Sequence, residues 1–439
     1  MAQSRDTICA LASGPPPAAI ATLRVSGPDV RTIISKRLSK PSLEPRHAPL
    51  VEIRSETGAV IDEGLAIFMP GPASYTGEDT FEITLHGGRM IIELALSSLM
   101  AAGARLAEPG EYTRRAFEAG KLDLTRAEAG ADLIDAESEA QLGQALRQMG
   151  GALESLYSDW RIQMTECLAL LEASIDFPDE EDAPDRVDGP VADKINALIA
   201  NLDRALSEGN ITERIRDGFR VAILGKPNAG KSTLLNQLAN REAAIVTDIP
   251  GTTRDVVEVR LTLGGYLVWI SDTAGLRETD DIVEAEGVRR AMKAGAEADL
   301  RIWLFDARDA VEDDQVQPGD IVVVNKSDLA SPDVSRETHL ISAKNGVGSE
   351  RVEAAIIERL SGLTSNLSAP MITRARHRQG IERAKVHLNA ALDHLNVGMG
   401  AEFTAEEVRL ASRELGALTG HVETEMVLGA VFSSFCIGK

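Results

Sequence analysis

The sequence predicts a multidomain protein: a small α+β domain at the N-terminus, an all-α helical domain, and an α/β domain inserted into the helical one. The chain of 439 residues is long for a single domain. Aromatic residues make up only 4% of it, while alanine, leucine, glutamate and arginine are plentiful, which favours long helices beside an α/β unit over an all-β protein. Helical patterns also stand on both sides of a glycine-rich segment at 225–232.

Composition limits the classes of partner. The formal net charge of −22 argues against a broad nucleic-acid-binding face, because phosphate contacts require clustered Lys and Arg. An RNA partner would need a local basic cluster such as residues 374–378, or a second protein. Cys9, Cys167 and Cys436 lie far apart, without a CxxC pair, so no disulfide framework is indicated. No apolar run is long enough to span a bilayer, and we expect a cytoplasmic protein without membrane contact.

The first 118 residues alternate strand-like and helical patterns. The run from Ile20 to Val25 alternates like a half-buried strand, and Ser26-Gly-Pro-Asp29 opens a helix that reaches about Leu38. Arg24 and Glu82 stand inside strand patterns, where a solvated strand face is the simplest interpretation. We therefore predict an α+β domain over residues 1–118, with further strands at 50–53, 64–68 and 79–85 and a helix at 90–100.

Helical periodicity dominates the next part of the chain. From Leu142 to Ile175 apolar residues recur every three or four positions, which predicts one helix of about 50 Å at 1.5 Å per residue. A second amphipathic stretch covers 195–206, and helices resume at 381–395 and 406–418. These segments suggest one discontinuous helical domain, although two independent helical units remain an alternative. The predicted bounds are 119–216 with 365–439 for the helical domain and 217–364 for the inserted α/β domain.

The glycine-rich segment follows an apolar strand and precedes a helix. It reads Gly225-Lys-Pro-Asn-Ala-Gly-Lys-Ser232, the spacing GxxxxGKS. Its glycines let backbone N–H groups converge on phosphate oxygens, Lys231 can reach the β- and γ-phosphates, and the Ser232 hydroxyl can hold Mg²⁺. A strand, such a loop and a helix together predict a nucleotide site.

Further motifs follow in the order that a GTPase requires. Asp248-Ile-Pro-Gly-Thr-Thr253 offers Thr253 to Mg²⁺ and the γ-phosphate, and the DxxG motif offers Asp272 to a metal-bound water. In the NKxD motif Asp328 can accept both N–H donors of a guanine edge, Asn325 ties this loop to the cradle, and the Ala343 N–H can meet the guanine oxygen. The predicted GTP-binding residues are Asn228, Ala229, Gly230, Lys231, Ser232, Thr233, Thr247, Asp248, Ile249, Pro250, Gly251, Thr252, Thr253, Asp272, Thr273, Ala274, Gly275, Asn325, Lys326, Asp328, Ser342, Ala343 and Lys344.

The hydrolytic machinery differs from that of Ras-like GTPases. These carry a glutamine after DxxG that orients water, but Leu276 stands at this position. An acidic side chain of the following loop could orient water instead, and a monovalent cation beside the phosphates could supply charge, with Asn228 as a ligand. The acidic candidates are Glu278, Asp280, Asp281, Glu284 and Glu286.

These motifs resemble a known family. GKPNAGKSTLLN, DIPGTTRD, DTAGLRE and NKSD are similar to the potassium-activated GTPases related to translation factors. The C-terminal FSSFCIGK at 432–439, and the N-terminal PGPASYTGED, LHGG and PGEYTRRAF, resemble one group among them, the MnmE or TrmE family of tRNA-modification GTPases. The resemblance covers essentially the whole chain.

The resemblance implies a tRNA-modifying enzyme. It implies an N-terminal domain that dimerises and binds a tetrahydrofolate derivative of the 5-formyl or 5,10-methylene type. It further implies a heterotetramer-type complex with the flavoprotein MnmG, which modifies C5 of the wobble uridine of certain tRNAs with an aminomethyl or carboxymethylaminomethyl group. The folate contacts implied for this chain are Arg24, Glu82, Lys121 and Lys439.

The resemblance also assigns roles in the GTPase reaction. It places potassium on Asn228, Thr247, Ile249 and Thr252, and Mg²⁺ on Ser232 and Thr253. It makes Glu284 the residue that orients water, so that the expected catalytic set is Glu284, Lys231, Thr253 and Cys436. A GTP-dependent switch in ribosome assembly is the alternative, but no GXXG loop in a basic setting is evident.

Overall fold

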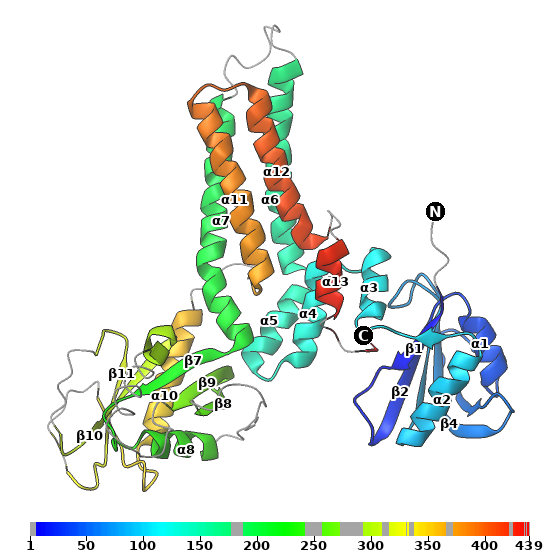
Figure 1. Ribbon diagram of the computed structural model, residues 1–439, viewed down its shortest axis with the longest axis horizontal. Helices are drawn as coiled ribbons and strands as arrows, with labels where there is room; N and C mark the ends of the chain where they lie inside the picture. The colour runs from blue at the N-terminus through cyan, green and yellow to red at the C-terminus, as the bar shows by residue number, and fades with distance from the viewer. Residues whose placement is uncertain are drawn as a thin grey trace, which may run out of the picture. The chain divides into compact units, whose positions relative to one another are not determined.

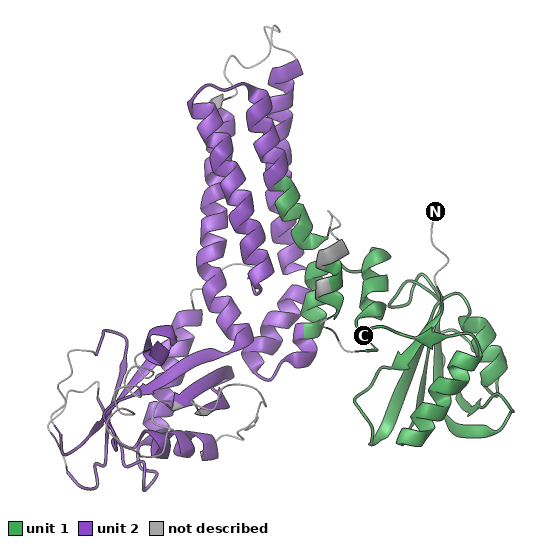
Figure 2. Ribbon diagram, in the orientation of Figure 1, with its two compact units in different colours: residues 1–131, 412–439 green, residues 132–411 purple. Residues whose placement is uncertain are grey.

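The computed structural model describes residues 6–176, 188–241, 257–272, 293–309, 316–330, 332, 338–365, 372–420, 425–433, 435 and 437–438. The chain divides into two compact units, residues 1–131 with 412–439 and residues 132–411 (Figure 2). The C-terminal residues thus belong to the same unit as the N-terminal ones. The predicted multidomain architecture is confirmed.

The first unit is built on a six-stranded sheet of order β3-β4-β5-β2-β1-β6. Its pairs are antiparallel except for the parallel pair β1–β6. Leu23 and Val25 of β2 are buried with Phe81 of β5 and the apolar sides of helices α1 and α2, which makes the core of this unit. The elements are β1 (Ile8–Leu11), β2 (Ala18–Ser26), α1 (Val30–Arg37), β3 (Leu50–Arg54), β4 (Val60–Met69), β5 (Thr80–Gly87), α2 (Arg89–Ala101) and β6 (Arg105–Leu106).

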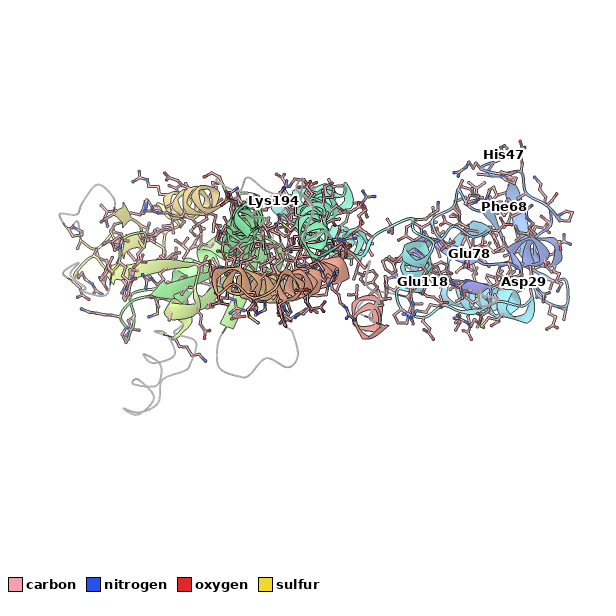
Figure 3. The ribbon with its side chains drawn as sticks, turned by 90° about the horizontal axis from the view of Figure 1, so that it is seen from above. Asp29, His47, Phe68, Glu78, Glu118 and Lys194 are labelled. Carbon is pink, nitrogen blue, oxygen red and sulfur yellow. The ribbon has the colours of Figure 1, made fainter. Side chains whose placement is uncertain are left out.

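The strands predicted at 20–25, 50–53, 64–68 and 79–85 are therefore confirmed as β2 to β5. Strand β1 was not predicted, because four residues are too few to display alternation. Phe68 of β4, labelled in Figure 3, is buried in this unit. The Arg31 guanidinium carbon lies 4.7 Å from its ring centroid.

The C-terminal segment of the chain packs against helix α3 (Glu111–Glu118) in this unit. Phe432 of α13 (Glu425–Ser433) is buried with Phe435 and Leu124, the first residue of α4 (Leu124–Asp135). Ile437 forms an isolated bridge with Pro109, and a Cβ at Gly438 would lie 2.1 Å from the Leu11 carbonyl oxygen. The chain end therefore lies against strand β1 and the segment before α3.

Long helices form one part of the second unit (Figure 1). Ion pairs join neighbouring helices on the bundle surface: Lys194 of α7 with Glu166 of α6 (Lys194 is labelled in Figure 3), and Lys385 of α11 with Asp203 of α7. Apolar side chains such as Met164, Leu198 and Leu388 are buried inside. The helices are α5 (Glu139–Met149), α6 (Ala152–Asp176), α7 (Asp188–Asp217), α11 (Ala375–Asn396) and the first part of α12 (Ala401–Thr419), of which residues 412–419 belong to the first unit.

The prediction of one continuous helix from Leu142 to Ile175 is wrong. The helix is interrupted at Gly150-Gly151, where Gly151 has φ +89°, a left-handed conformation that glycine adopts without steric cost. The predicted stripe is buried in α6, at Leu153, Trp160, Met164 and Leu171. In α5 it is not, since Leu142 is 44% exposed and Leu146 53%, and this helix buries Gln141, Gln144 and Gln148 instead.

The α/β part of the second unit has a six-stranded sheet of order β12-β11-β10-β7-β9-β8. All pairs are parallel except β8–β9, which is a hairpin. Both faces are apolar, as expected for parallel strands covered by helices. The elements are β7 (Phe219–Leu224), α8 (Lys231–Arg241), β8 (Val257–Leu263), β9 (Tyr266–Asp272), β10 (Leu300–Asp306), β11 (Ile321–Asn325), β12 (His339–Leu340) and α10 (Ser349–Thr364).

Candidate nucleotide-binding site

The glycine-rich loop lies at the carboxyl end of central strand β7, the edge where parallel α/β sheets bind ligands. Gly225 has φ +141° and Gly230 φ +101°. A Cβ would lie 2.2 Å from the Leu304 carbonyl oxygen at Gly225, and 2.2 Å from Asn325 Nδ2 at Gly230. No side chain fits at either position, so both glycines of the motif are required for this loop to close.

Lys231 is held inside this loop. Its side chain is buried, and Nζ donates to the carbonyl oxygens of Gly225 at 2.9 Å and of Lys226 at 3.0 Å. Ser232 and Thr233, in the first turn of α8, are exposed beside it. An ammonium group, hydroxyls and a helix N-terminus therefore meet at one place, an arrangement suited to a polyphosphate.

Asn325 joins the segments of three motifs. Its Nδ2 donates to the Ala229 carbonyl oxygen at 2.8 Å, and its Oδ1 accepts from the Ala343 N–H at 2.9 Å. The predicted tie between Asn325 and the phosphate loop is thus confirmed. The Ala343 N–H, which we expected to meet a guanine oxygen, donates to Asn325 in this structure, and its contact with a base stays a prediction.

Asp328 presents an ionised carboxylate next to this cluster. The side chain is exposed, and its Oδ1 accepts from the Ser342 hydroxyl at 2.6 Å. This hydrogen bond, and then the charge of Lys344, lowers the pKa of Asp328. The carboxylate is therefore a pure acceptor at neutral pH, which suits the adjacent N–H donors of guanine.

Asp306, the last residue of β10, was not identified from the sequence. Lys326 Nζ donates to Asp306 Oδ2 and to the Asn228 carbonyl oxygen, both at 2.7 Å. Arg308 and Lys326 hold the pKa of Asp306 well below its ordinary value. The sequence carried a signal for it, because Asp306 ends an apolar strand pattern just as the NKxD motif does, and parallel strands bring such ends to the same edge of the sheet. Asp306 thus anchors Lys326 across the phosphate loop.

Asp306→Asn tests this anchor through pH. Because folding lowers the pKa of Asp306, its stabilisation is complete above the unfolded value of about 4 and fades as pH falls toward the folded value. We expect the variant to melt a few degrees below the parent at pH 7, and the gap to narrow with acidification below about pH 4. Thermal unfolding by circular dichroism measures both. A gap that does not depend on pH would contradict the anchor.

Gly230→Ala tests the loop geometry. The added methyl would collide with Asn325 Nδ2 and favours a different backbone angle. We expect nucleotide affinity to fall by about tenfold or more, since a strained glycine position costs ~1–3 kcal/mol. Gly362→Ala in α10 is the matched control, because a Cβ there meets nothing within 4 Å. It should leave affinity unchanged, and equal affinity losses in the two variants would contradict the prediction.

Strand β9 ends at Asp272, whose Cα pairs with Ile223 of β7, so Asp272 reaches the edge of the sheet that carries the loop. The remaining predicted positions of this site lie outside the described residues: Thr247, Asp248, Ile249, Pro250, Gly251, Thr252, Thr253, Thr273, Ala274, Gly275 and Glu284. Their roles stay predictions.

A second group of predicted residues lies in the first unit. Arg24 and Glu82 are partners across strands β2 and β5, with Nε 2.8 Å from Oε1. The guanidinium carbon of Arg24 lies 5.6 Å and 5.5 Å from the ring centroids of Tyr75 and Tyr112, and Nη1 lies 3.5 Å from the Gly438 carbonyl oxygen. The structure therefore brings Gly438 to Arg24, one of the predicted folate residues, which pairs with a second, Glu82.

The two tyrosines were missed from the sequence. Both lie in motifs that carry the family resemblance, Tyr75 in PGPASYTGED and Tyr112 in PGEYTRRAF, which was the available signal. Lys121 is exposed. It lies beside the turn at 70–79, since a Cβ at Gly77 would be 3.7 Å from the Lys121 Cε. Cys436 and Lys439 lie outside the described residues.

The described ranges contain no group of three or more His, Cys, Asp or Glu side chains that could hold a metal ion by themselves. Within the same ranges, no helix is long and apolar enough to cross a membrane.

A mainly parallel sheet with this glycine loop, a buried lysine and an ionised NKxD aspartate defines the class of P-loop guanine-nucleotide-binding domains. Two family profiles match: "MnmE helical domain" over residues 124–436 and "GTP-binding protein TrmE N-terminus" over 7–121. The chain belongs to the MnmE (TrmE) family.

Relatives match over their full length. The tRNA modification GTPase MnmE of Hyphomonas neptunium is 55% identical over 439 residues, covering 99% of this chain and 100% of the relative. That of Caulobacter vibrioides is 46% identical over 452 residues, with the same coverages. Among solved structures, the G domain of the T. maritima FeoB iron transporter is 24% identical, covers 32% of this chain and 98% of its own, and has a TM-score of 0.25.

Proposed function

We propose that this protein hydrolyses GTP to GDP and phosphate and uses that cycle to drive tRNA modification. The observation that carries the proposal is the Asn325 cluster, which holds the phosphate loop, the ionised Asp328 and the SAK segment in one arrangement. Family membership supplies the link to tRNA. The finer proposal is modification of C5 of the wobble uridine, together with MnmG.

Mg²⁺ fits the residues at the phosphate loop. The exposed Ser232 hydroxyl lies at the start of α8, and Asp272 ends the strand paired with β7. We propose that Ser232 and Thr253 hold the ion and that Asp272 acts through a bound water. When bound, Mg²⁺ neutralises charge on the β- and γ-phosphates. Lys231 is already buried where it adds a second positive charge to the same group.

We propose potassium as a second activator, with ligands from Asn228, Thr247, Ile249 and Thr252. Asn228 has φ +61°, and Lys326 holds its carbonyl oxygen, so its backbone is fixed while its side chain is exposed. A cation there would compensate for Leu276, which cannot orient water. We assign the orientation of the attacking water to Glu284, which would act as a general base.

Potassium dependence is directly testable. GTP turnover at equal ionic strength should be faster in KCl than in NaCl, by about tenfold or more, if the cation offsets transition-state charge worth more than ~1.4 kcal/mol. Nucleotide affinity, measured in parallel, should change much less. Equal turnover rates in the two salts would reject the cation and leave GTP binding untouched.

We propose that the first unit binds a tetrahydrofolate derivative and forms the homodimer. Arg24, Glu82, Lys121 and Lys439 are the proposed folate contacts. The paired charges of Arg24 and Glu82, beside the ring of Tyr75, suit a ligand with amide, carboxylate and aromatic parts. Glu82 pairs with Ile67 across β5 and β4, so the two side chains lie on the same face of the sheet. Leu50 and Leu65 lie on this face too, and the three apolar side chains are exposed, which suits a protein contact.

We propose the following domain bounds: the folate-binding domain at 1–118, the helical domain at 119–216 with 365–439, and the GTPase domain at 217–364. The basic cluster at 374–378 is a weak candidate for tRNA, because Arg374 pairs with Asp132 at 2.7 Å and Arg378 with Glu213 at 3.0 Å. A surface shared with MnmG is the better proposal for tRNA contact. Cys436 is proposed to act in the modification chemistry.

The decisive experiment is nucleoside analysis of tRNA. Cells that lack this chain should lose the C5-modified wobble uridine, and the parent gene should restore it, whereas one encoding Cys436→Ala should not. GTP turnover of purified Cys436→Ala should equal that of the parent. Unchanged nucleosides together with ribosome-assembly defects would favour the alternative switch function.

A further inference from the structure

The β8–β9 hairpin stands between two segments with predicted roles at the γ-phosphate. Strand β8 begins at Val257, shortly after Thr253, and β9 ends at Asp272. A strand pair is stiff along its length, so a shift imposed at these ends is carried to the turn at Gly264-Gly265. The segments that contact the turn and the outer face of the hairpin are therefore the ones that such a shift would move.

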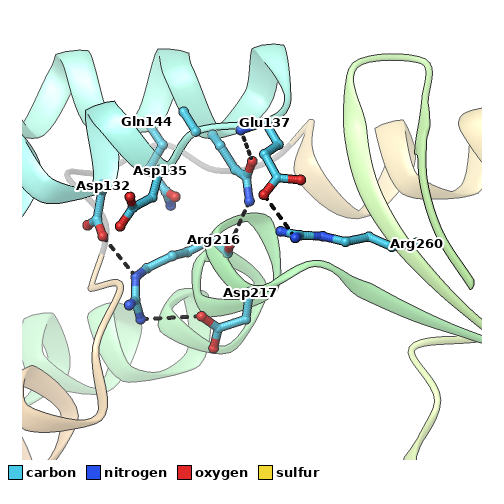
Figure 4. Close-up of a pocket in the computed structure, with 9 residues that line it drawn as sticks. Asp132, Asp135, Glu137, Gln144, Arg216, Asp217 and Arg260 are labelled. Atoms are coloured by element: carbon cyan, nitrogen blue, oxygen red, sulfur yellow. Dashed lines mark hydrogen bonds and ion pairs between the residues drawn. The ribbon is translucent and has the colours of Figure 1, made fainter. Parts of the chain in front are cut away.

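The corner segment, which we define as residues 132–140 from the last turn of α4 to the start of α5, contacts this hairpin. Glu137 Oε1 lies 2.8 Å from Arg260 Nη1 on β8 (Figure 4). The Ala140 N–H donates to the Gly265 carbonyl oxygen at 3.0 Å. The Arg260 guanidinium carbon lies 5.1 Å from the ring centroid of Trp269 on β9. The corner segment thus holds both a strand and the turn of the hairpin.

The same part of the chain also holds the helix that leads into strand β7. Arg216 Nε lies 3.1 Å from Asp132 Oδ1, and its carbonyl oxygen accepts from Gln141 Nε2 at 2.7 Å (Figure 4). One turn away, Gln144 Nε2 donates to the Thr212 carbonyl oxygen at 3.0 Å. Trp269 Nε1 donates to the Asp217 carbonyl oxygen at 2.8 Å. The corner segment, the hairpin and the end of α7 form one polar junction.

The chemistry of this junction is unusual for a permanent packing contact. Helix α5 buries Gln141 and Gln144 against it and leaves Leu142 and Leu146 exposed. Hydrogen bonds to carbonyl oxygens hold only in one alignment and can be exchanged, whereas interdigitated apolar side chains resist a shift. A pocket of about 300 Å³, lined among others by Asp135, Arg216 and Asp217, leaves room beside the contacts.

Arg260 itself is incompletely paired. Its Nη1 meets Glu137, but its Nε is buried without a hydrogen-bond partner in the part of the chain that the structure describes. A buried donor left unpaired costs about 1–3 kcal/mol, so this arrangement of Arg260 is held only by its surroundings. An arrangement in which Nε finds a partner would recover part of this cost, which gives the contact a physical reason to change with the nucleotide.

We propose that this junction is the contact that couples the nucleotide state to the helical part of the second unit. The Glu137–Arg260 ion pair and the Ala140–Gly265 hydrogen bond are stronger with one of the two nucleotides, GDP or GTP, than with the other. Helix α5, which continues from the corner segment, carries the difference to α6 and α7. The inference uses only the guanine-nucleotide binding of the proposed function.

Linkage turns the proposal into an affinity measurement. If the contact favours one nucleotide state, removing it must change the ratio of the dissociation constants for GDP and for a non-hydrolysable GTP analogue. In the full-length chain, Glu137→Gln and Arg260→Gln should each change this ratio, in the same direction, by about fivefold or more. Because the two residues act as one pair, the double variant should change it no further.

Arg301→Gln is the matched control. Arg301 pairs with Asp320 at 2.9 Å on the same sheet, with a side-chain exposure of 22% against 21% for Arg260. It should leave the ratio unchanged, and thermal unfolding should verify that every variant is folded. If Glu137→Gln and Arg260→Gln weaken both nucleotides equally, or neither, the junction is a static contact and the proposal is overturned. Absence of nucleotide binding in the parent chain would instead reject the proposed function.

Discussion

Asp328→Asn is expected to weaken GTP binding by about 100- to 1000-fold, because one hydrogen bond from guanine to a charged acceptor, worth ~1.5–3 kcal/mol, is lost and the other, to the amide oxygen, loses its charge assistance. The amide also presents an N–H donor toward the guanine amino group, which is itself a donor. Xanthine carries a carbonyl oxygen at that position, so the same variant should bind XTP better than the parent chain does. Titration calorimetry with GTP and XTP measures both changes.

Ser342→Ala is the control for this exchange. Ser342 is one of the predicted GTP-binding residues, and its hydroxyl donates to Asp328 at 2.6 Å, so that it supports the carboxylate that reads the base. Its loss should weaken GTP by about tenfold or less, the value of one hydrogen bond near 1 kcal/mol, and should not improve XTP binding. If Asp328→Asn retains parental GTP affinity, Asp328 does not determine the base, and GTP over ATP loses its main support.

The parts predicted correctly from the sequence are those with local causes. The phosphate loop follows from the positive φ angles at Gly225 and Gly230 and from a strand and a helix next to them in the chain. The strands of the first unit follow from alternation, since Leu23 and Val25 face the core and Arg24 does not. In each case the determining residues are neighbours in sequence, and a pattern can display them.

Helix α5 was predicted wrongly because its environment is set by distant segments. Its leucine spacing continues that of α6, but Gly151 ends the register. The surface that α5 meets consists of carbonyl oxygens at the end of α7, which attract Gln141 and Gln144 rather than leucines. Nothing in a helical pattern reports that its partner is the end of another helix.

The surroundings of Arg24 were hidden for a related reason. The contact with Gly438 joins residues at opposite ends of the chain, and the ring of Tyr112 comes from a helix beyond the sheet. Chain closure of this kind leaves no trace in local periodicity. The family resemblance named Arg24 and Glu82, but only the structure adds the two tyrosines and the chain end beside them.

Lys231→Ala is expected to lower GTP turnover by about 10²–10³-fold, the cost of removing one preorganised group that stabilises transition-state charge. The Lys231 side chain is buried, and carbonyl oxygens of the loop hold its ammonium group in place. In the alanine variant no other charged group of the loop takes this position. Single-turnover phosphate release measures the loss.

Lys226→Ala removes an equal charge from the same loop, but from an exposed side chain. Surface charge is screened and adds little, so this control should keep turnover within about threefold of the parent, corresponding to ~0.6 kcal/mol. Thermal unfolding of both variants separates folding from chemistry. Equal turnover losses in the two variants would mean that the loop responds to net charge, and that the buried position of Lys231 has no part in hydrolysis.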